Sequence, residues 1–256
     1  MKITFLGTGT SQGIPIIGSK HPVCLSEDPR DKRLRVSIAL SWEDYFFVID
    51  CGPDFRQQML RANTRHLDGI VFTHEHADHT AGLDDIRPFF FRQGKINMHM
   101  TSKVHSELSH RFNYIFNDEN KYPGAPSVQV TTIDKTTPFA LGNKTVIPIE
   151  VMHHTMPVLG YRIDDFAYLT DVKTIDAKEK EKLKNLDVLV LNALRIEAHP
   201  SHLNLEEALE LIEELQPKRA YLTHISHLLG FHAEVEKELP KHVFLAYDML
   251  EISTSL

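Results

Sequence analysis

Cysteine is scarce in this chain of 256 residues, which holds only Cys24 and Cys51. Two cysteines cannot form the disulfide framework of a small secreted domain, and a reducing compartment suits them. Long apolar runs are also missing, and the first run, residues 2–6, is too short for the core of a signal peptide. The sequence therefore predicts a cytoplasmic protein without a membrane anchor.

An excess of positive charge is absent as well. The chain has 28 basic and 35 acidic residues, which gives a formal net charge of −7 at pH 7. This balance provides no overall field that attracts nucleic acid or an anionic membrane, so we expect neither as a partner. No low-complexity segment, charge block or Pro/Gly/Ser-rich linker divides the sequence. We therefore expect one domain over residues 1–256, long enough for a substantial core.

The sequence is rich in metal-binding side chains, and they are concentrated in residues 74–79, HEHADH. The preceding residues, 67–73, are apolar and rich in β-branched and aromatic types, which predicts a buried strand that ends at Thr73. The histidines and carboxylates thus lie on a loop at the carboxyl end of a strand. Imidazole nitrogens and carboxylate oxygens bind first-row divalent metals.

The spacing within this segment favours two ions. His74 and His76 are two residues apart, so in an extended chain they point to one side. Asp78 and His79 follow as the chain turns toward a helix near residues 80–83, where they could face a second ion. The helical H-E-x-x-H pattern of metalloproteases does not apply, because Asp78 stands where that pattern needs its second histidine.

Further candidate ligands follow strands expected in the second half of the chain. They are one of His153 and His154 after strand 145–152, Asp171 after strand 166–170, and His224 after strand 220–223. Side chains alternate along a strand, so His153 continues the face of Ile149 and Val151, and His154 points away. We favour His153 as the ligand, and the sequence leaves His154 open.

The segment THEHADH resembles the T-H-x-H-x-D-H signature of the metallo-β-lactamase-fold hydrolases. That resemblance implies an α/β fold, a four-layer αββα sandwich with one or two metal ions at the edge of its two sheets. It also implies a complete ligand set, formed by His74, His76, Asp78, His79, His153, Asp171 and His224. Asp171 would lie between two ions and bridge them. Zn²⁺ and Mn²⁺ both suit these ligands.

Several short segments resemble the PhnP-type phosphodiesterases of this family, namely 7–13, 50–54, 80–87 and 222–227. The resemblance implies hydrolysis of a small cyclic phosphodiester, of the phosphoribosyl cyclic phosphate or cyclic nucleotide type, by a hydroxide held between two ions. Asp78 and Asp171 would be catalytic through those ions. His202 is the candidate general acid, with His199 in reserve, although His202 also stands at the boundary of a helix expected over 204–215.

Candidate contacts to the substrate phosphate are Ser11, Arg87 and Arg195. Ser11 lies in a glycine-rich loop whose backbone N–H groups could approach an anion, but a tight turn explains such a loop equally well. Arg87 could bind a phosphate through two hydrogen bonds, or it could form an ion pair with Asp84 or Asp85.

Two further local expectations concern strand ends and helix starts. Asp50 closes a strand expected over 45–50, and we expect it to orient the metal histidines rather than to cap the helix expected over 54–62. Further along, Ser102 is expected to cap a helix that runs to about residue 113.

A second, structural zinc site is also implied by the resemblance. PhnP-type chains carry C-x-C-x-x-C in the loop after the first strand, where this chain has Ser19, His21 and Cys24, and a histidine after the last ligand, here His227. Serine is a poor zinc ligand, so only three side chains would hold this ion. The alternative is that Cys24 is a small buried residue and the two histidines are unrelated surface groups.

Other activities of the same fold remain as alternatives. A tRNA 3′-processing endonuclease is expected to carry a glycine where this chain has Ala77 and a basic arm that grips tRNA, and neither is present. A two-metal site would serve a lactone or thioester hydrolase equally well. A non-catalytic metal-binding module is disfavoured, because every expected ligand position is occupied. We expect a homodimer that acts on a small phosphodiester.

Overall fold

The computed structural model, which describes residues 1–117, 119 and 121–254, contains two β-sheets. The first consists, from one edge to the other, of β15 (Glu251–Ser253), β1 (Lys2–Gly7), β2 (Ser37–Trp42), β3 (Tyr45–Ile49), β4 (Gly69–Val71), β5 (Ile96–Met100) and β6 (Val128–Thr132). The second consists of β11 (Thr174–Ile175), β8 (Lys144–His153), β9 (Met156–Ile163), β10 (Phe166–Leu169), β12 (Val188–Asn192), β13 (Arg219–Thr223) and β14 (Val243–Leu245), and β7 (Phe139–Leu141) pairs with β8. Within the sheets, β3 to β6 run parallel to one another, as do β10, β12, β13 and β14.

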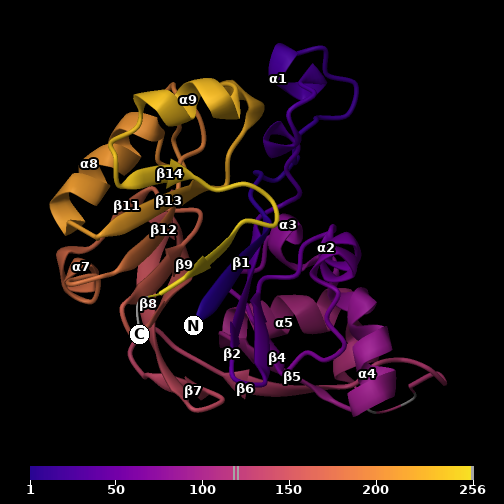
Figure 1. The fold of residues 1–256 in the computed structure, drawn as a ribbon. Coiled ribbons are helices and arrows are strands. Elements are labelled where there is room, and N and C mark those ends of the chain that lie inside the picture. Colours follow the sequence, from indigo (N-terminus) through magenta and orange to yellow (C-terminus); the bar gives the residue numbers. More distant parts are fainter. Residues whose placement is uncertain (118, 120, 255–256) are drawn as a thin grey trace.

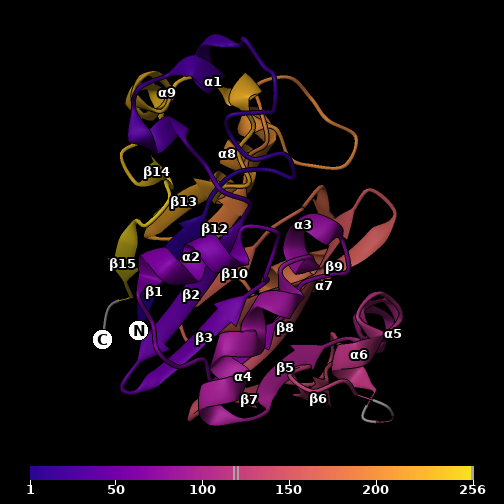
Figure 2. The same cartoon turned by 90° about the vertical axis from the view of Figure 1, so that its right-hand side faces the viewer.

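Helices lie on the outer faces of both sheets (Figures 1 and 2). Beside the first sheet lie α2 (Phe55–Ala62), α3 (Ala77–Thr80), α4 (Arg87–Gln93), α5 (Ser102–Arg111) and α6 (Asn113–Phe116). Beside the second lie α7 (Ala177–Glu181), α8 (Leu205–Leu215) and α9 (His232–Glu238). The connecting segments contain α1 (Pro22–Leu25) and the 3-10 helices η1 (Pro29–Asp31), η2 (Leu83–Ile86) and η3 (His227–Leu229). In the part of the chain that the structure describes, no helix is long and apolar enough to cross a membrane.

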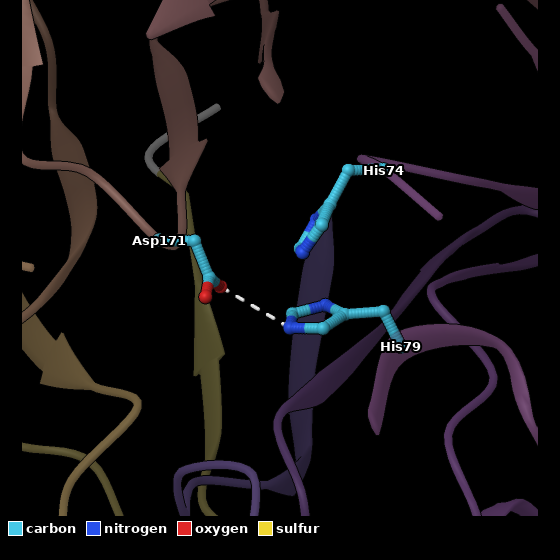
Figure 3. A group of neighbouring side chains, drawn as sticks. All are labelled: His74, His79 and Asp171. Atoms are coloured by element: carbon cyan, nitrogen blue, oxygen red, sulfur yellow. Dashed lines mark ion pairs between the residues drawn. The ribbon is translucent and has the colours of Figure 1, made fainter. Parts of the chain in front are cut away.

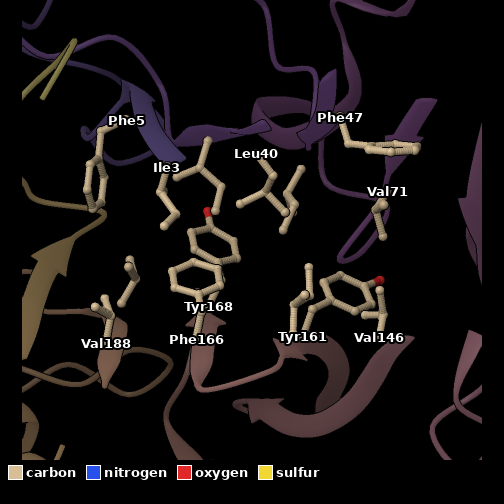
Figure 4. Close-up of a cluster of buried hydrophobic side chains, with 14 of the residues drawn as sticks. Ile3, Phe5, Leu40, Phe47, Val71, Val146, Tyr161, Phe166, Tyr168 and Val188 are labelled. Carbon is tan, nitrogen blue, oxygen red and sulfur yellow. The ribbon is translucent and has the colours of Figure 1, made fainter. Parts of the chain in front are cut away.

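Apolar side chains fill the space between the two sheets (Figure 4). Ile3 and Leu40 of the first sheet pack with Phe166 and Tyr168 of the second, and all four are fully buried. Full burial of such a side chain contributes about 1.5–3 kcal/mol relative to leaving it exposed. One further apolar cluster joins the first sheet to the helices on its outer face, and another joins the second sheet to its helices. The layers therefore follow the order helix, sheet, sheet, helix, which confirms the αββα sandwich expected from the sequence.

Helix starts agree with the sequence at α8 but not at α5. Asn204 caps α8, and its side chain and that of Glu207 form a reciprocal capping box. At α5 the expected cap is wrong by one residue. Oγ1 of Thr101, not of Ser102, accepts a hydrogen bond from the backbone nitrogen of Val104, at 3.2 Å. Ser102 is instead the first residue of the helix, and it is exposed.

Candidate metal centre

Strand ends from both sheets bring the expected metal ligands to one edge of the sandwich. The metal loop, residues 74–79, follows β4 of the first sheet, whereas Asp171 follows β10 and His224 follows β13 of the second. Figure 3 shows His74 and His79 approaching Asp171 from the opposite side. In α/β sheets, the carboxyl ends of parallel strands are the usual location of ligand sites. The chain therefore assembles the centre from segments that are about 150 residues apart in sequence.

Ligand atoms of this centre lie within 4.8 Å of one another in overlapping groups. The groups are His74, His79 and Asp171; Asp78, His79 and His224; and His153, Asp171 and His202. Because His79 and Asp171 each belong to two groups, the side chains form one continuous cluster. His76 lies beside it, with its ring centroid 4.6 Å from that of His74 and 5.4 Å from that of His153.

Several ring nitrogens of the cluster make no hydrogen bond to the protein. Nε2 of His74, Nε2 of His79, Nδ1 of His202 and both ring nitrogens of His224 are buried and make no hydrogen bond. Buried polar atoms in native proteins normally have a partner. Imidazole nitrogens that lack one, beside carboxylates at a strand end, suit divalent ions such as Zn²⁺ or Mn²⁺. The residues present therefore fit the metal ions that the sequence implies.

Carboxylates make the centre attractive to positive charge. Asp171 places Oδ2 3.2 Å from Nε2 of His79 and Oδ1 3.4 Å from Nε2 of His224. Burial opposes ionisation of Asp171, but the imidazoles of His224 and His79 outweigh it and hold the pKa of this carboxyl well below its usual range. Burial likewise opposes a charge on His79, yet Asp171 and Asp50 raise its pKa well above the usual value. A cation, either a proton or a metal ion, is thus stabilised here.

Asp50 fixes the metal loop through hydrogen bonds. Its carboxylate accepts hydrogen bonds from the backbone nitrogen and the hydroxyl of Thr73, at 2.9 and 2.8 Å, and contacts Nδ1 of His79. Asp54, not Asp50, is the N-cap residue of α2. The orienting role expected for Asp50 is therefore the one that the contacts support.

The hairpin between β8 and β9 presents His153 to the centre. Nδ1 of His153 lies 2.8 Å from the backbone oxygen of Ser201, which leaves Nε2 for a metal. His154, in contrast, is exposed and has a left-handed backbone with φ of 56°. Of the two histidines that the sequence left open, the structure brings only His153 into the cluster.

Left-handed backbone recurs at the strand ends that form the centre. Asp50, Asp171 and His224 have φ values of 63°, 57° and 54°. This region is crowded for any residue with a Cβ atom and is uncommon outside glycine. At all three positions the chain turns sharply as it leaves a strand, and the side chain belongs to the centre or contacts it.

Two glycines allow the metal loop to pack closely on the segment after β3. A Cβ atom at Gly52 would lie 2.0 Å from the backbone oxygen of Asp78, and one at Gly82 would lie 2.1 Å from that of Gly52. Only glycine avoids these clashes with the backbone. Gly52 and Gly82 lie in segments 50–54 and 80–87, both of which resemble PhnP-type chains.

His202 lies inside the cluster rather than merely at the start of α8. Nδ1 of His202 is 3.7 Å from Oδ1 of Asp171, and its ring stacks on that of His224 with centroids 4.8 Å apart. Burial lowers the pKa of His202 to about 3. His199, the reserve candidate, lies farther out, with its ring centroid 5.2 Å from that of His202.

The three candidate phosphate-binding residues contact other groups of the protein. Arg87 forms an ion pair with Asp84 at 2.6 Å, one of the alternatives that the sequence left open, and its guanidinium also donates to the hydroxyl of Tyr122. Arg195 donates to backbone oxygens of its own loop. Ser11 is exposed, and its backbone oxygen accepts from a neighbouring guanidinium. Contacts of these three residues with a substrate stay predictions.

The structure brings together two of the three residues of the expected structural zinc site. His21 and His227 do meet, with ring centroids 4.7 Å apart. Among the described residues, however, no metal-ligating group combines them with Cys24. Nδ1 of His21 accepts a hydrogen bond from the backbone nitrogen of Val23, and Cys24 packs in a small apolar cluster with Val23 and Ile14. Cys24 is thus a small buried residue, and a zinc ion held by His21, Cys24 and His227 stays a prediction.

Sequence reasoning missed two groups that orient the ligands. The hydroxyl of Thr170 donates to Oδ2 of Asp171 at 2.7 Å, and the backbone oxygen of Ser201 contacts His153. A threonine precedes Asp171, as Thr73 precedes a histidine of the metal loop, and this repetition was a usable signal. The role of Ser201 depends on a backbone atom, which no residue pattern reveals.

Comparison with known proteins adds a family and several relatives. A family model described as a beta-lactamase superfamily domain matches residues 45–225. One solved structure is described as the crystal structure of a new diphosphatase from the PhnP family, and its sequence is 38% identical to this one. The match covers 100% of this chain and 98% of that chain, and the two structures superpose with a TM-score of 0.93. An octanoyltransferase of Porphyromonas gingivalis is 39% identical over 253 residues, which is 98% of this chain and 51% of that protein.

Ribonuclease Z of Methanococcus maripaludis is a more distant relative. It is 27% identical over 169 residues, which is 63% of this chain and 48% of that protein. The chain thus spans about half the length of these curated relatives. The octanoyltransferase is about twice as long as this chain, and its name does not tell which half carries the named activity.

Proposed function

Because the chain belongs to the β-lactamase superfamily and, within it, to the PhnP family of hydrolases, we propose that it hydrolyses a small cyclic phosphodiester with two divalent metal ions. The phosphodiester is of the phosphoribosyl cyclic phosphate or cyclic nucleotide type. The observation that supports this most is the cluster of buried imidazole nitrogens without hydrogen bonds around Asp171.

The ligands divide into two sets that share one carboxylate. One ion would be held by His74, His76 and His153, the other by Asp78, His79 and His224, with Asp171 between them. Two ions in this arrangement supply a nucleophilic water at neutral pH and bind the oxygens of the phosphate. The protein's part is to hold the ions at a fixed separation, and the contact from Asp50 to His79 keeps one ligand in orientation.

His202 is suited to the proton transfer that the leaving group needs. Its Nδ1 is buried without a hydrogen-bond partner and lies near Asp171. Because burial favours the neutral ring, the imidazole would take up a proton only beside the anionic phosphate, and it could then give that proton to the oxygen that leaves phosphorus. An alkoxide leaving group needs this help because it is a strong base.

A diphosphate is the second candidate substrate, and the relative described as a diphosphatase favours it. Diphosphates and phosphodiesters both present a phosphorus with two linkages, so the same ions would serve either. The relatives named ribonuclease Z and octanoyltransferase suggest two further candidate substrates, precursor tRNA and an acyl ester. The net charge of −7 disfavours tRNA, whose binding needs many cationic contacts.

A substrate panel tests this proposal. The Zn²⁺- and Mn²⁺-loaded protein is assayed with a ribose 1,2-cyclic phosphate, a cyclic nucleotide, an organic diphosphate, a lactone, an octanoyl thioester and precursor tRNA. We expect the highest kcat/KM for one of the cyclic phosphodiesters, with little change between low and high salt. A higher kcat/KM for the diphosphate would select the second candidate. Efficient cleavage of precursor tRNA, with a steep loss of rate as salt rises, would refute the proposal.

A further inference from the structure

A cavity of about 320 Å³ lies directly beside the metal loop. Its walls come from the metal loop, the start of α5, the segment after β6 and the strands β8 and β9, and they are formed by residues 73–75, 101–104 and 133–135 with Glu150, Pro157 and Leu159. The volume falls in the range of about 300–1,000 Å³ that small-molecule sites occupy. His74 lines the cavity and belongs to the metal centre, so the cavity adjoins the centre at this residue.

A larger cavity of about 730 Å³ lies along α8 and is less suited to the substrate. It is lined by α8, by Ile196 and by the residues around His242, and by no ligand of the metal centre. A substrate whose phosphorus must reach the metal ions can extend into the smaller cavity without leaving the site.

The inner wall of the smaller cavity is apolar. Val104 of α5, Ile133 after β6 and Leu159 of β9 line it, and their side chains are 1%, 5% and 5% exposed. Each of these residues also belongs to one of the apolar clusters of the fold, so the wall is fixed by packing. Such a wall offers no partner to the hydroxyl groups of a sugar, which would be costly to bury there.

The rim of the cavity has charged groups but no surplus of positive charge. Nζ of Lys103 lies 2.5 Å from Oε1 of Glu75, and Nζ of Lys135 lies 2.7 Å from Oε1 of Glu150. The remaining acid, Asp134, accepts hydrogen bonds from two threonines that follow it. Both lysines are thus matched by carboxylates, and nothing at the rim favours a second anionic group of the substrate.

We propose that this cavity binds an uncharged alkyl or aryl substituent of the phosphodiester and selects substrates by its size. The inference rests on the proposed hydrolysis of a phosphodiester and narrows its substrate class to esters that carry an uncharged group, such as the base of a cyclic nucleotide, rather than a second phosphate. Burial of each additional methylene in an apolar wall strengthens binding about threefold to fourfold. The protein should therefore prefer esters with a longer apolar group, up to the length that the cavity accepts.

A series of esters with one leaving group tests the cavity. Methyl, butyl and hexyl 4-nitrophenyl phosphates release the same phenolate, so differences in kcat/KM report on the alkyl group alone. We expect kcat/KM of the metal-loaded protein to rise along the series. Ser102→Trp, at an exposed position of the cavity wall, should abolish this rise and retain activity on the methyl ester, because the indole fills the cavity. Ser106→Trp, also exposed on α5 but outside the cavity, is the matched control and should retain the rise.

Binding of alkylphosphonates separates the two proposals. Calorimetry with methylphosphonate and hexylphosphonate should give tighter binding of the hexyl compound to the wild type and to Ser106→Trp, but not to Ser102→Trp. Turnover with equal kcat/KM for all three esters would overturn the cavity assignment and leave the hydrolase proposal standing. A preference for hexylphosphonate without turnover of these esters or of the cyclic phosphodiesters would support the cavity and refute the hydrolase proposal. An equal effect of both tryptophan variants would also overturn the assignment.

Discussion

Oδ2 of Asp50 lies 2.7 Å from Nδ1 of His79, and neither side chain has any exposed surface. The contact uses one ring nitrogen and directs the other, Nε2, toward Asp78 and Asp171. A histidine ligand held in this way by a carboxylate has a fixed ring orientation and a more basic metal-binding nitrogen. Asp50 thus links the end of β3 to the metal centre.

Asp50→Asn should weaken metal binding without unfolding the protein. Loss of the carboxylate beside a histidine ligand lowers metal affinity about 10- to 100-fold. Competition with a fluorescent chelator measures this affinity directly. Asp54→Asn is the matched control, since Asp54 pairs with Arg35 and not with a ligand. Equal affinities of the wild type and Asp50→Asn would exclude the orienting role.

Asp171→Asn and His76→Ala should each abolish hydrolysis of a phosphodiester. Asp171 is the carboxylate shared by two ligand groups, and His76 is an exposed residue of the metal loop whose removal leaves the core intact. We expect losses in kcat well beyond the roughly 10- to 100-fold effects of changing a partner of a ligand. Circular dichroism checks the fold of both variants. Rates within tenfold of the wild type for both would contradict the two-metal site.

His202→Ala should affect substrates according to their leaving group. Removal of a general acid lowers the rate by about 10²- to 10⁴-fold when the leaving group is a poor one. An alkoxide ester should therefore lose far more activity than a 4-nitrophenyl ester, whose phenolate leaves without a proton. The metal content of the variant is measured in parallel. A uniform rate loss together with a lower metal content would identify His202 as a metal ligand instead.

His232 should make the stability of the fold depend on pH. Nη2 of Arg33 lies 3.1 Å from Nδ1 of His232, and a guanidinium only donates, so this nitrogen must be unprotonated in the folded state. Burial and then Arg33 lower the pKa of His232 from its ordinary 6.5 to about 4. Between these values the unfolded chain binds more protons than the folded one, so the free energy of unfolding rises with pH.

Urea denaturation of the metal-free protein measures this contribution. Between pH 7 and pH 5 the wild type should lose about 2 kcal/mol that His232→Gln does not lose, since glutamine can accept the same hydrogen bond and does not titrate. His110→Gln, at an exposed position of α5, should keep the pH dependence of the wild type. An unchanged pH dependence in His232→Gln would mean that other groups cause it.

The metal centre was largely predictable because its densest part is continuous in sequence. Residues 74–79 carry a pattern that needs no knowledge of the fold, and His153 could be preferred over His154 from the alternation of side chains along β8. The order of the layers followed from the same resemblance. These features depend on local spacing or on a signature, which a sequence contains directly.

Features that depend on distant segments were not predictable. The cavity beside the metal loop has walls from residues 73–75, 101–104 and 133–135 with Glu150, Pro157 and Leu159, and no pattern connects them in the sequence. Arg87 had equally good partners in a phosphate and in Asp84, and only the structure decides which contact forms. Cys24 lies where the resemblance implies a zinc ligand, whereas its packing with Ile14 and Val23 depends on the fold and not on that position.

The left-handed backbone at Asp50, Asp171 and His224 has a consequence for engineering. Each of these residues occupies a conformation that costs about 1 kcal/mol or more for a side chain with a Cβ atom. Glycine at the same positions would relieve that strain, so the residues present lower the free energy of unfolding relative to glycine. A library selected only for survival of heating should accumulate glycine at 171 and 224 and lose its metal ions in the process. Thermostable variants of this protein must therefore be screened for metal content as well as for melting temperature.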